Sequence, residues 1–303
     1  MSARRTLRIG TRGSALALWQ AQHIAALLGA ARDSRTTEIV TIATTGDIVV
    51  DVPLWQVEGK AFFTKELDEA LLDGRIDLAV HSLKDVATEL RSGISLAAVP
   101  EREDPRDALV TARGAKSLAE LPRGARIATS SVRRRAFVRH ARADLETVEL
   151  RGNVPTRVRQ LDEGRFEAII VAVAGLNRLG LASRISAYLD PAEFPPAAAQ
   201  GALGVCARID DVEVLAALDP LNHLPSRTAT TAERSFLRQL EAGCQVPAGV
   251  LATVCADRVS MQAAMCKPDG TGWTRARIGA EISEAESAGR ALAIALAAGE
   301  KRA

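Results

Sequence analysis

The chain has 303 residues, of which 47% are hydrophobic and 25% charged, and its formal net charge is +2. This composition is typical of a globular protein with two or three domains, and it excludes a disordered chain. The chain holds no run of 18 apolar residues, and Met1–Thr6 is too short and too polar for a signal peptide. We therefore expect a cytoplasmic protein without a membrane span.

Positive charge is concentrated in the middle of the chain. Residues 105–185 carry 16 Lys and Arg against 8 Asp and Glu, whereas residues 1–100 carry 11 against 12. Arginine outnumbers lysine 33 to 6, which favours bidentate recognition of oxyanions, although a GC-rich genome produces the same bias. Only 3% of the residues are aromatic, so no stacking platform accompanies the arginines, and nucleic acid is not the expected partner.

The first hundred residues alternate short apolar runs with helical periodicity, which predicts an α/β domain. Strands are expected at 7–10, 38–42, 78–80 and 95–99, and helices at 15–28 and 63–72. The loops 11–14 and 81–85 follow predicted strands. Ligands of open α/β sheets bind beyond the carboxyl ends of strands, so these two loops are candidate walls of a site.

A charged segment bounded by prolines, residues 100–105, predicts a crossing into a second α/β domain. Its expected strands, 126–128, 147–150 and 168–173, are each followed by a segment that contains arginine. The first such segment, Ala128–Arg135, places hydroxyls and guanidinium groups at a helix start, which favours a bound carboxylate or phosphate. Asn153 is the expected N-cap of the next helix. The arginines do not follow helical spacing, and this favours a ligand site over a solvated face.

A second crossing at 195–201 predicts a return to the first domain, because two crossings between α/β lobes form a hinged cleft of the periplasmic-binding-protein type. The last third predicts a helix at 228–240, antiparallel strands near 250–255, 259–266 and 273–278, and a helix at 282–298. The expected fold class is therefore α/β, with two lobes and a small C-terminal α+β domain that has a three-stranded antiparallel sheet. Domain 1 comprises 1–100 and 199–219, domain 2 comprises 105–195, and domain 3 comprises 222–303.

The four cysteines are Cys206, Cys244, Cys255 and Cys266, and they form no C-x-x-C pair, so no metal site is predicted. Cys206, Cys255 and Cys266 lie in apolar strand or loop patterns and are expected to be buried. Cys244 differs, because it follows a helix that ends near Gly243 and precedes Pro247 in a shaped loop. This pattern leaves both a reactive thiol and an ordinary buried cysteine open for Cys244.

Eight ordered motifs cover nearly the whole chain and together resemble the porphobilinogen deaminase (hydroxymethylbilane synthase) family. The motifs are Leu7–Gln20, Asp77–Asp85, Glu101–Asp107, Thr129–Arg134, Leu150–Val154, Ala172–Gly180, Gln200–Gly204 and Gly243–Pro247. The resemblance implies an enzyme that condenses four porphobilinogen molecules head to tail into the linear tetrapyrrole hydroxymethylbilane and releases ammonia at each step. It further implies a monomer whose dipyrromethane primer is joined to Cys244 by a thioether. Each pyrrole carries an acetate and a propionate, which is the kind of ligand that arginines bind.

The resemblance also implies roles for single residues. Asp85 is the expected catalytic residue, because a carboxylate beside pyrrole N–H groups stabilises the cations formed when ammonia leaves. Without the resemblance, a loop or helix cap would be favoured for Asp85, a solvated side chain for Lys84, and a helix surface position for Gln20. Ser131 is expected to be a helix cap, and Arg135 is expected to be solvated. The expected primer-binding residues are Cys244, Lys84, Asp85, Thr129, Ser130, Arg133, Arg134 and Arg157, and the expected substrate-binding residues are Arg12, Ser14, Gln20, Arg151, Arg157, Arg178 and Gln200.

The sequence departs from the family pattern at several positions. Glu58–Ala61 replaces a Gly-Gly-Lys-Gly loop, and Thr45, Ala87, Pro155 and Ala199 replace other characteristic residues. Ala199 stands for a glycine beside the second crossing, where the hinge is expected. The alternative function is a two-lobed protein that binds an anionic solute without chemistry, although a third domain with Cys244 has no role in such a protein.

Overall fold

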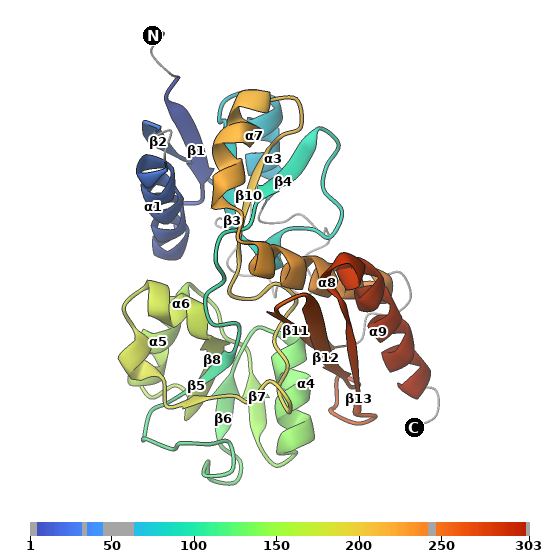
Figure 1. The fold of residues 1–303 in the computed structure, drawn as a ribbon. Helices are drawn as coiled ribbons and strands as arrows, with labels where there is room; N and C mark the ends of the chain where they lie inside the picture. The colour runs from blue at the N-terminus through green and yellow to red at the C-terminus, as the bar shows by residue number, and fades with distance from the viewer. Residues whose placement is uncertain (1–4, 32–34, 45–63, 242–246, 301–303) are drawn as a thin grey trace. The chain divides into compact units, whose positions relative to one another are not determined.

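The computed structural model describes residues 5–31, 35–44, 64–241 and 247–300 (Figure 1). The predictions for Thr45, for the loop around Lys60 and for Cys244 lie outside these residues. The chain divides into two compact units, the first comprising Met1–Val52, Gln56–Arg102 and Ala202–Arg227 and the second comprising Pro53–Trp55, Glu103–Gly201 and Thr228–Ala303. The boundaries of the three predicted domains and the hinged cleft stay predictions.

The first unit contains a five-stranded sheet in the order β2-β1-β3-β10-β4. Its strands are β1 (Leu7–Thr11), β2 (Thr37–Thr41), β3 (Leu78–Ser82), β4 (Ile94–Ala98) and β10 (Leu203–Arg208). β1 pairs in parallel with β2 and β3, whereas β10 is antiparallel to β3 and β4. The carboxyl ends of β1 and β3 therefore lie at one edge of this sheet.

Helices cover the sheet of the first unit, namely α1 (Ala15–Ala30), α3 (Lys65–Leu72) and α7 (Val212–Leu218), with the 3₁₀ helices η2 (Leu83–Asp85) and η4 (Asp219–Leu221). α1 begins after its N-cap Ser14, whose Oγ accepts a hydrogen bond from the Ala17 amide at 3.3 Å. Ala21, Ile24 and Leu28 recur at spacings of three and four residues and are fully buried. This face of α1 packs with Leu7, Ile9, Leu78 and Val80 of the sheet to form the core of the unit.

The second unit contains a five-stranded sheet in the order β7-β6-β8-β5-β9. Its strands are β5 (Asp107–Thr111), β6 (Arg126–Ala128), β7 (Glu146–Val148), β8 (Ala168–Ala172) and β9 (Ala187–Tyr188). β6 is parallel to β7 and β8, so the carboxyl ends of these three strands share an edge, and β5 is antiparallel to β8 and β9. Each parallel strand leads toward a helix: α4 (Val132–Ala141), α5 (Val154–Asp162) and α6 (Val173–Arg178); the 3₁₀ helix η3 (Ala182–Arg184) follows α6.

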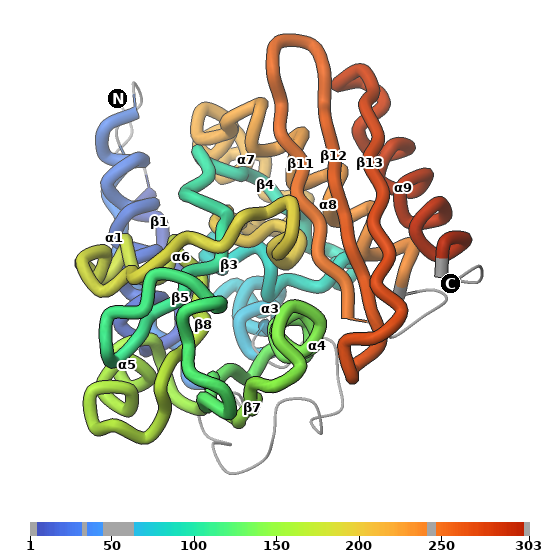
Figure 2. Tube along the Cα trace, turned by 90° about the horizontal axis from the view of Figure 1, so that it is seen from below, coloured from blue at the N-terminus to red at the C-terminus, as the bar shows by residue number. Residues whose placement is uncertain are grey.

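The same unit contains the antiparallel sheet β11 (Ala248–Cys255), β12 (Arg258–Met265) and β13 (Thr274–Glu281). Figure 2 shows these strands side by side with α9 next to β13. Phe236 of α8 (Leu224–Glu241), Met261 of β12 and Leu292 of α9 (Ala285–Glu300) belong to one buried core, and η5 (Ile282–Glu284) precedes α9. The predicted fold class of two α/β sheets and a small α+β part with a three-stranded antiparallel sheet is confirmed.

One prediction about the cysteines is wrong. Cys206 and Cys266 are buried, but Cys255 is exposed. Cys255 is the last residue of β11 and pairs with Arg258 across the turn to β12, so its side chain lies beyond the end of the core. An apolar pattern predicts the strand, but it does not show where the core ends along that strand.

Candidate active site

The edge at the carboxyl ends of β1 and β3 carries the predicted site residues of the first unit. Arg12 and Ser14 follow β1, and Lys84 and Asp85 follow β3. Gln20 of α1 joins the two segments, because its Nε2 donates a hydrogen bond to Ser82 Oγ at 2.8 Å. Only 2% of Gln20 is exposed, so it is not an ordinary surface residue of the helix. Gln20 therefore fixes the start of α1 to the end of β3.

Asp85 is an exposed carboxylate on a firmly held turn. Leu83 in the same 3₁₀ helix is fully buried, and its amide donates to the Ala202 carbonyl at 3.0 Å. Lys84 and Asp85 are both exposed. Among the residues that the structure describes, the Asp85 carboxylate has no hydrogen-bond or ion-pair partner. Its oxygens are thus available to donors outside this part of the chain.

His81 lies four residues before Asp85 and was not assigned a role from the sequence. It is 6% exposed, and its Nε2 is buried without a hydrogen-bond partner within the described ranges. Burial, with a smaller contribution from the charge of Arg12, lowers the pKa of His81 to about 4. The imidazole is therefore neutral at physiological pH, and it adds no charge to the edge that carries Asp85.

In the second unit, the segment after β6 forms the start of α4 much as the sequence predicts. Ser131 is confirmed as the N-cap, because its Oγ accepts from the Arg134 amide at 3.3 Å. The fully buried Thr129 accepts from the Ser131 amide at 3.3 Å through its Oγ1, and Ser130 is half-buried. Two hydroxyls therefore shape the turn, and Arg133 and Arg134 lie in the first turn of the helix.

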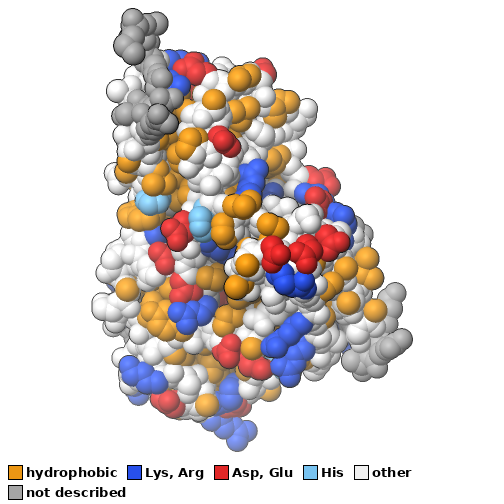
Figure 3. All heavy atoms as spheres, viewed as in Figure 1, with side chains coloured by type: hydrophobic (Ala, Val, Ile, Leu, Met, Phe, Trp, Pro, Cys, Tyr) orange, Lys and Arg blue, Asp and Glu red, His pale blue; other side chains and the backbone are white. Residues whose placement is uncertain are grey.

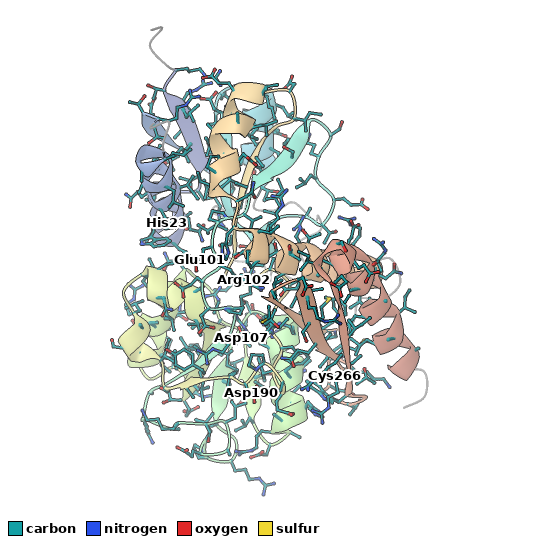
Figure 4. All side chains as sticks on the ribbon, viewed as in Figure 1. His23, Glu101, Arg102, Asp107, Asp190 and Cys266 are labelled. Carbon is teal, nitrogen blue, oxygen red and sulfur yellow. The ribbon has the colours of Figure 1, made fainter. Side chains whose placement is uncertain are left out.

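Arg133 and Arg134 are turned inward onto a carboxylate of the chain itself. Asp107, the first residue of β5, is fully buried and is labelled in Figure 4. Its Oδ2 accepts from Arg133 Nη2 at 2.7 Å, and its Oδ1 accepts from Arg134 Nε at 3.0 Å and Nη2 at 2.6 Å. Oδ1 also accepts from Gln200 Nε2 at 2.8 Å. The sequence did not single out Asp107, and it is the residue that brings three predicted site residues together.

The charge of Asp107 is stabilised by its surroundings. Burial by itself raises the pKa of the Asp107 carboxyl, but the charges of Arg133 and Arg134 and their hydrogen bonds hold it well below its usual range. Burial lowers the pKa of Arg133, while the facing carboxylate raises it. One anion therefore lies between two cations, and the buried group keeps a net charge of one positive unit.

Arg178, at the end of α6, binds the second crossing. It is 9% exposed, and its Nη2 donates to the Gly201 carbonyl at 2.6 Å. Burial lowers the pKa of Arg178 to about 10, and the charge of Glu103 acts in the opposite direction. Asn177 donates to Glu103 Oε1 at 3.1 Å, and the Glu103 amide donates to the Gly201 carbonyl at 3.3 Å. The first and second crossings are thus joined within this unit.

The second crossing contains the departure from the family pattern at Ala199. Ala199 has φ of 59°, in the left-handed region that favours glycine. Its amide donates to Glu233 Oε2 at 2.6 Å, and Glu233 Oε1 accepts from the Ala252 amide at 2.8 Å. The backbone here keeps the conformation that a glycine would adopt, because the buried Glu233 holds it in place.

Arg151 and Arg157 lie where β7 leads into α5. Asn153 is confirmed as the N-cap of α5, and Pro155 stands in the first turn, where a missing N–H costs no helix bond. Arg157 Nε donates to the Gly152 carbonyl at 2.7 Å. Arg151 Nη2 is buried and has no acceptor among the residues that the structure describes, and its Nε is 3.9 Å from Glu149 Oε1. Arg151 thus has an unused donor at the edge of the sheet.

The prediction that Arg135 is solvated is wrong. Its side chain is 19% exposed, and its Nη1 donates to Glu149 Oε2 at 3.0 Å. Several other arginines of this region also pair with acids, including Arg126 with Glu167 and Arg184 with Asp162. On the face drawn in Figure 3, basic side chains accordingly lie beside acidic ones. The local excess of positive charge does not form one continuous basic field there.

The described ranges contain no group of three or more His, Cys, Asp and Glu residues that could hold a metal ion. Among the helices described, none is long and apolar enough to cross a membrane.

Models of known protein families match most of the chain. The porphobilinogen deaminase model for the dipyrromethane cofactor-binding domain matches residues 7–216, and the model for the C-terminal domain of that family matches residues 228–298. The chain belongs to the porphobilinogen deaminase family. Porphobilinogen deaminase of Syntrophobacter fumaroxidans is 46% identical over 286 residues, covering 94% of this chain and 92% of that protein. That of Chromobacterium violaceum is 48% identical over 285 residues, with the same coverage.

As predicted, the chain is therefore an enzyme with porphobilinogen deaminase activity, which forms hydroxymethylbilane in tetrapyrrole biosynthesis. Its first matched domain binds dipyrromethane, so the predicted cofactor is confirmed. Membership of the family sets aside the alternative of a solute-binding protein without chemistry.

Solved structures similar to the chain include the VFT2 domain of BvgS from Bordetella pertussis, with 16% identity and a TM-score of 0.40 over 71% of this chain and 85% of that one. An arginine-specific periplasmic binding protein of Salmonella typhimurium has 14% identity and a TM-score of 0.40 over 72% of this chain and 92% of that one.

Proposed function

We propose that Asp85 is the catalytic carboxylate at which porphobilinogen units are joined. The observation that carries the proposal is an exposed carboxylate, without a partner among the described residues, on a turn fixed by the buried Leu83. A side chain whose backbone is held in place needs little reorganisation when charge develops beside it. Arg12, Ser14 and Gln20 line the same edge of the first sheet and bind the substrate.

The chemistry explains why a carboxylate is needed. The C–N bond of the aminomethyl group breaks, ammonia leaves, and the positive charge left behind is shared with the N–H of the pyrrole. The Asp85 carboxylate accepts a hydrogen bond from that N–H and stabilises the cation. When the new C–C bond forms, the ring that attacks becomes cationic, and its carbon then loses a proton. Asp85 stabilises this second cation, accepts the proton that the ring carbon loses, and passes it on.

We further propose that the cations at the edge of the second sheet bind the acetate and propionate groups of the primer and of the substrate. When bound through Cys244, dipyrromethane supplies the pyrrole position to which the first porphobilinogen is joined. The residues fit such a group, because their donors are guanidinium forks and hydroxyls, the groups that carboxylates accept hydrogen bonds from. Arg151 supports this assignment most directly, since its Nη2 is buried and the described part of the chain offers it no acceptor. Thr129, Ser130, Arg133, Arg134 and Arg157 bind the primer, and Arg151, Arg157, Arg178 and Gln200 bind the substrate.

Porphobilinogen is accordingly the substrate, and a monomer in the cytoplasm is the expected state of the protein. The side chain of Lys84 is exposed next to Asp85 and pairs with a carboxylate of the primer.

The role of Asp85 is tested with the variant Asp85→Asn. This change keeps the size of the side chain and removes its charge, so we expect kcat to fall by about 100-fold or more. Because no contact of the described residues is lost, Tm stays within about 1 °C of that of the parent enzyme. The intact mass shows that the primer is retained.

Glu89→Gln is the matched control, because Glu89 is an exposed acid four residues further along the chain. It should leave kcat unchanged. An Asp85→Asn enzyme that turns over porphobilinogen at a rate similar to that of the control would remove Asp85 from the mechanism.

A further inference from the structure

We propose that Asp107 is a positioning residue of this enzyme, which acts with Gln200 to hold the guanidinium groups of Arg133 and Arg134 for the carboxylates of the primer. The proposal rests on the proposed function of the two arginines. Asp107 itself touches neither primer nor substrate in this assignment.

The hydrogen bonds at Asp107 leave little freedom to either guanidinium group. Arg134 donates hydrogen bonds to Asp107 through Nε and Nη2, and to the Ile170 carbonyl through Nη1 at 3.1 Å. Arg133 donates a hydrogen bond to Asp107 through Nη2 and another to the Pro195 carbonyl through Nη1 at 2.8 Å. Both planes are therefore fixed by at least one carboxylate bond and one carbonyl bond.

Gln200 completes the arrangement from the second crossing. Its Oε1 accepts from Arg134 Nη2 at 3.2 Å, and its Nε2 donates to Asp107 Oδ1 and to the Pro105 carbonyl, both at 2.8 Å. Gln200 is fully buried. Its amide therefore contacts an arginine and the carboxylate that holds this arginine, and it also ties the first crossing to both.

The charges explain why a carboxylate is required here. Two adjacent guanidinium groups repel each other, and Arg134 lowers the pKa of Arg133 through this repulsion. Asp107 offsets one of the two charges, so the pair can be buried together before any ligand binds. One positive charge remains uncompensated within the group, and this charge favours an anionic ligand.

One donor of the pair has no acceptor in the part of the chain that the structure describes. Arg133 is 7% exposed, and among the described residues its Nε has no acceptor. An arginine that is held on one side and retains a donor on the other is arranged to bind a carboxylate with little loss of side-chain entropy. Asp107 thus sets where this donor points.

The proposal predicts that Asp107 acts on turnover through Arg134, and a double-mutant cycle tests this. The holoenzyme variants are Asp107→Asn, Arg134→Gln and the double variant, with Asp162→Asn as the control. Asp162 forms an exposed ion pair with Arg184 in the same unit, so its loss should change little. The kcat for porphobilinogen is measured well below the Tm of every variant, and intact mass verifies that the primer is present.

We expect each single variant to lower kcat by more than about tenfold, and the double variant to be no slower than the slower single variant. If Asp107 only stabilises the fold, Asp107→Asn would lower Tm but leave kcat unchanged at low temperature. If Asp107 acts on turnover independently of Arg134, the reductions in kcat caused by Asp107→Asn and Arg134→Gln would multiply in the double variant. Either result would overturn the proposal. If Arg134→Gln alone has normal turnover, the proposed carboxylate-binding role of Arg134 fails. Normal turnover of Asp107→Asn beside a slow Arg134→Gln refutes the positioning role alone.

The double variant also keeps the test decisive if Asp107→Asn does not fold. It removes one cation together with one anion, so the buried group keeps the net charge that it has in the parent enzyme. We then expect a folded protein with the kcat of Arg134→Gln. A double variant that fails to fold, or that is at least tenfold slower than Arg134→Gln, would contradict the proposal.

Discussion

Replacement of Gly201 by alanine is expected to destabilise the second unit strongly. Gly201 has φ of 87°, and a Cβ at this position would lie 2.3 Å from the Glu103 carbonyl oxygen and 3.1 Å from that of Asp104. Both oxygens belong to the backbone, so no side-chain rotation relieves the overlap. The Gly201 carbonyl also accepts from Arg178 Nη2 and from the Glu103 amide, which restrains any movement of this segment.

The magnitude follows from two contributions. A left-handed conformation costs a residue with a Cβ about 1–2 kcal/mol, and overpacking against fixed atoms costs a further 1–3 kcal/mol or so. We therefore expect Gly201→Ala to lower the free energy of unfolding by about 2–5 kcal/mol. At about 2–4 °C of Tm per kcal/mol, the decrease in Tm is on the order of 4–20 °C.

Alanine substitutions at two other glycines, with Tm measured by calorimetry, separate the backbone contribution from the overpacking contribution. Gly180 has φ of 69° with no atom within 4 Å of an added Cβ, so Gly180→Ala reports the backbone cost alone. Gly29 lies in α1 and also has open space around it, so Gly29→Ala should raise stability by up to about 1 kcal/mol. Equal Tm values for Gly201→Ala and Gly180→Ala would refute the reasoning, because the contact with Glu103 would then cost nothing.

The remaining predictions concern buried carboxylates and acid. Asp77 is fully buried and accepts hydrogen bonds from the Arg8 amide, Nε and Nη2 at 2.8–3.1 Å. Asp77→Asn should therefore lower the free energy of unfolding by about 2–3 kcal/mol. The control Asp73→Asn, at an exposed residue, should lower it by less than about 0.5 kcal/mol. The pKa values of Asp77 and Asp107 lie below those of the unfolded chain, because arginines stabilise both carboxylates even though burial opposes this. Their stabilisation is therefore complete above the unfolded pKa of about 4 and is lost as the pH falls through the folded values. Calorimetry should show Tm falling below about pH 4, and a Tm that stays constant down to pH 2 would contradict this assignment.

Most elements of the fold could be predicted because their residues carry a local period. The buried residues of α1 and the alternation of β12 are visible in the sequence without any knowledge of their neighbours. β5 and α6 were not predicted. β5 follows the charged crossing directly and begins with a charged residue, Asp107, and α6 is six residues long with a glycine inside it. Such short elements depend on the sheet that surrounds them more than on their own propensity.

The site could be predicted only in part, because its partners are far apart in the sequence. The strand ends with hydroxyls and arginines are local signals, and they correctly indicate the edges of the two sheets. Asp107 lies 26 residues from Arg133 and 93 from Gln200, and no local pattern reveals these pairs. One signal was present: an aspartate at the start of the apolar strand Asp107–Thr111 must be paired if it is buried. Likewise, the inward orientation of Arg133 and Arg134 depends on the position of β5.

The intact mass of the purified protein tests the central claim most directly, since a covalent dipyrromethane primer on Cys244 distinguishes this enzyme from a protein that only binds anions. The parent protein should exceed the mass of its 303-residue chain by one dipyrromethane unit, and a Cys244→Ser variant should lack this addition and be inactive. An active parent protein with the unmodified mass of its chain would contradict the account.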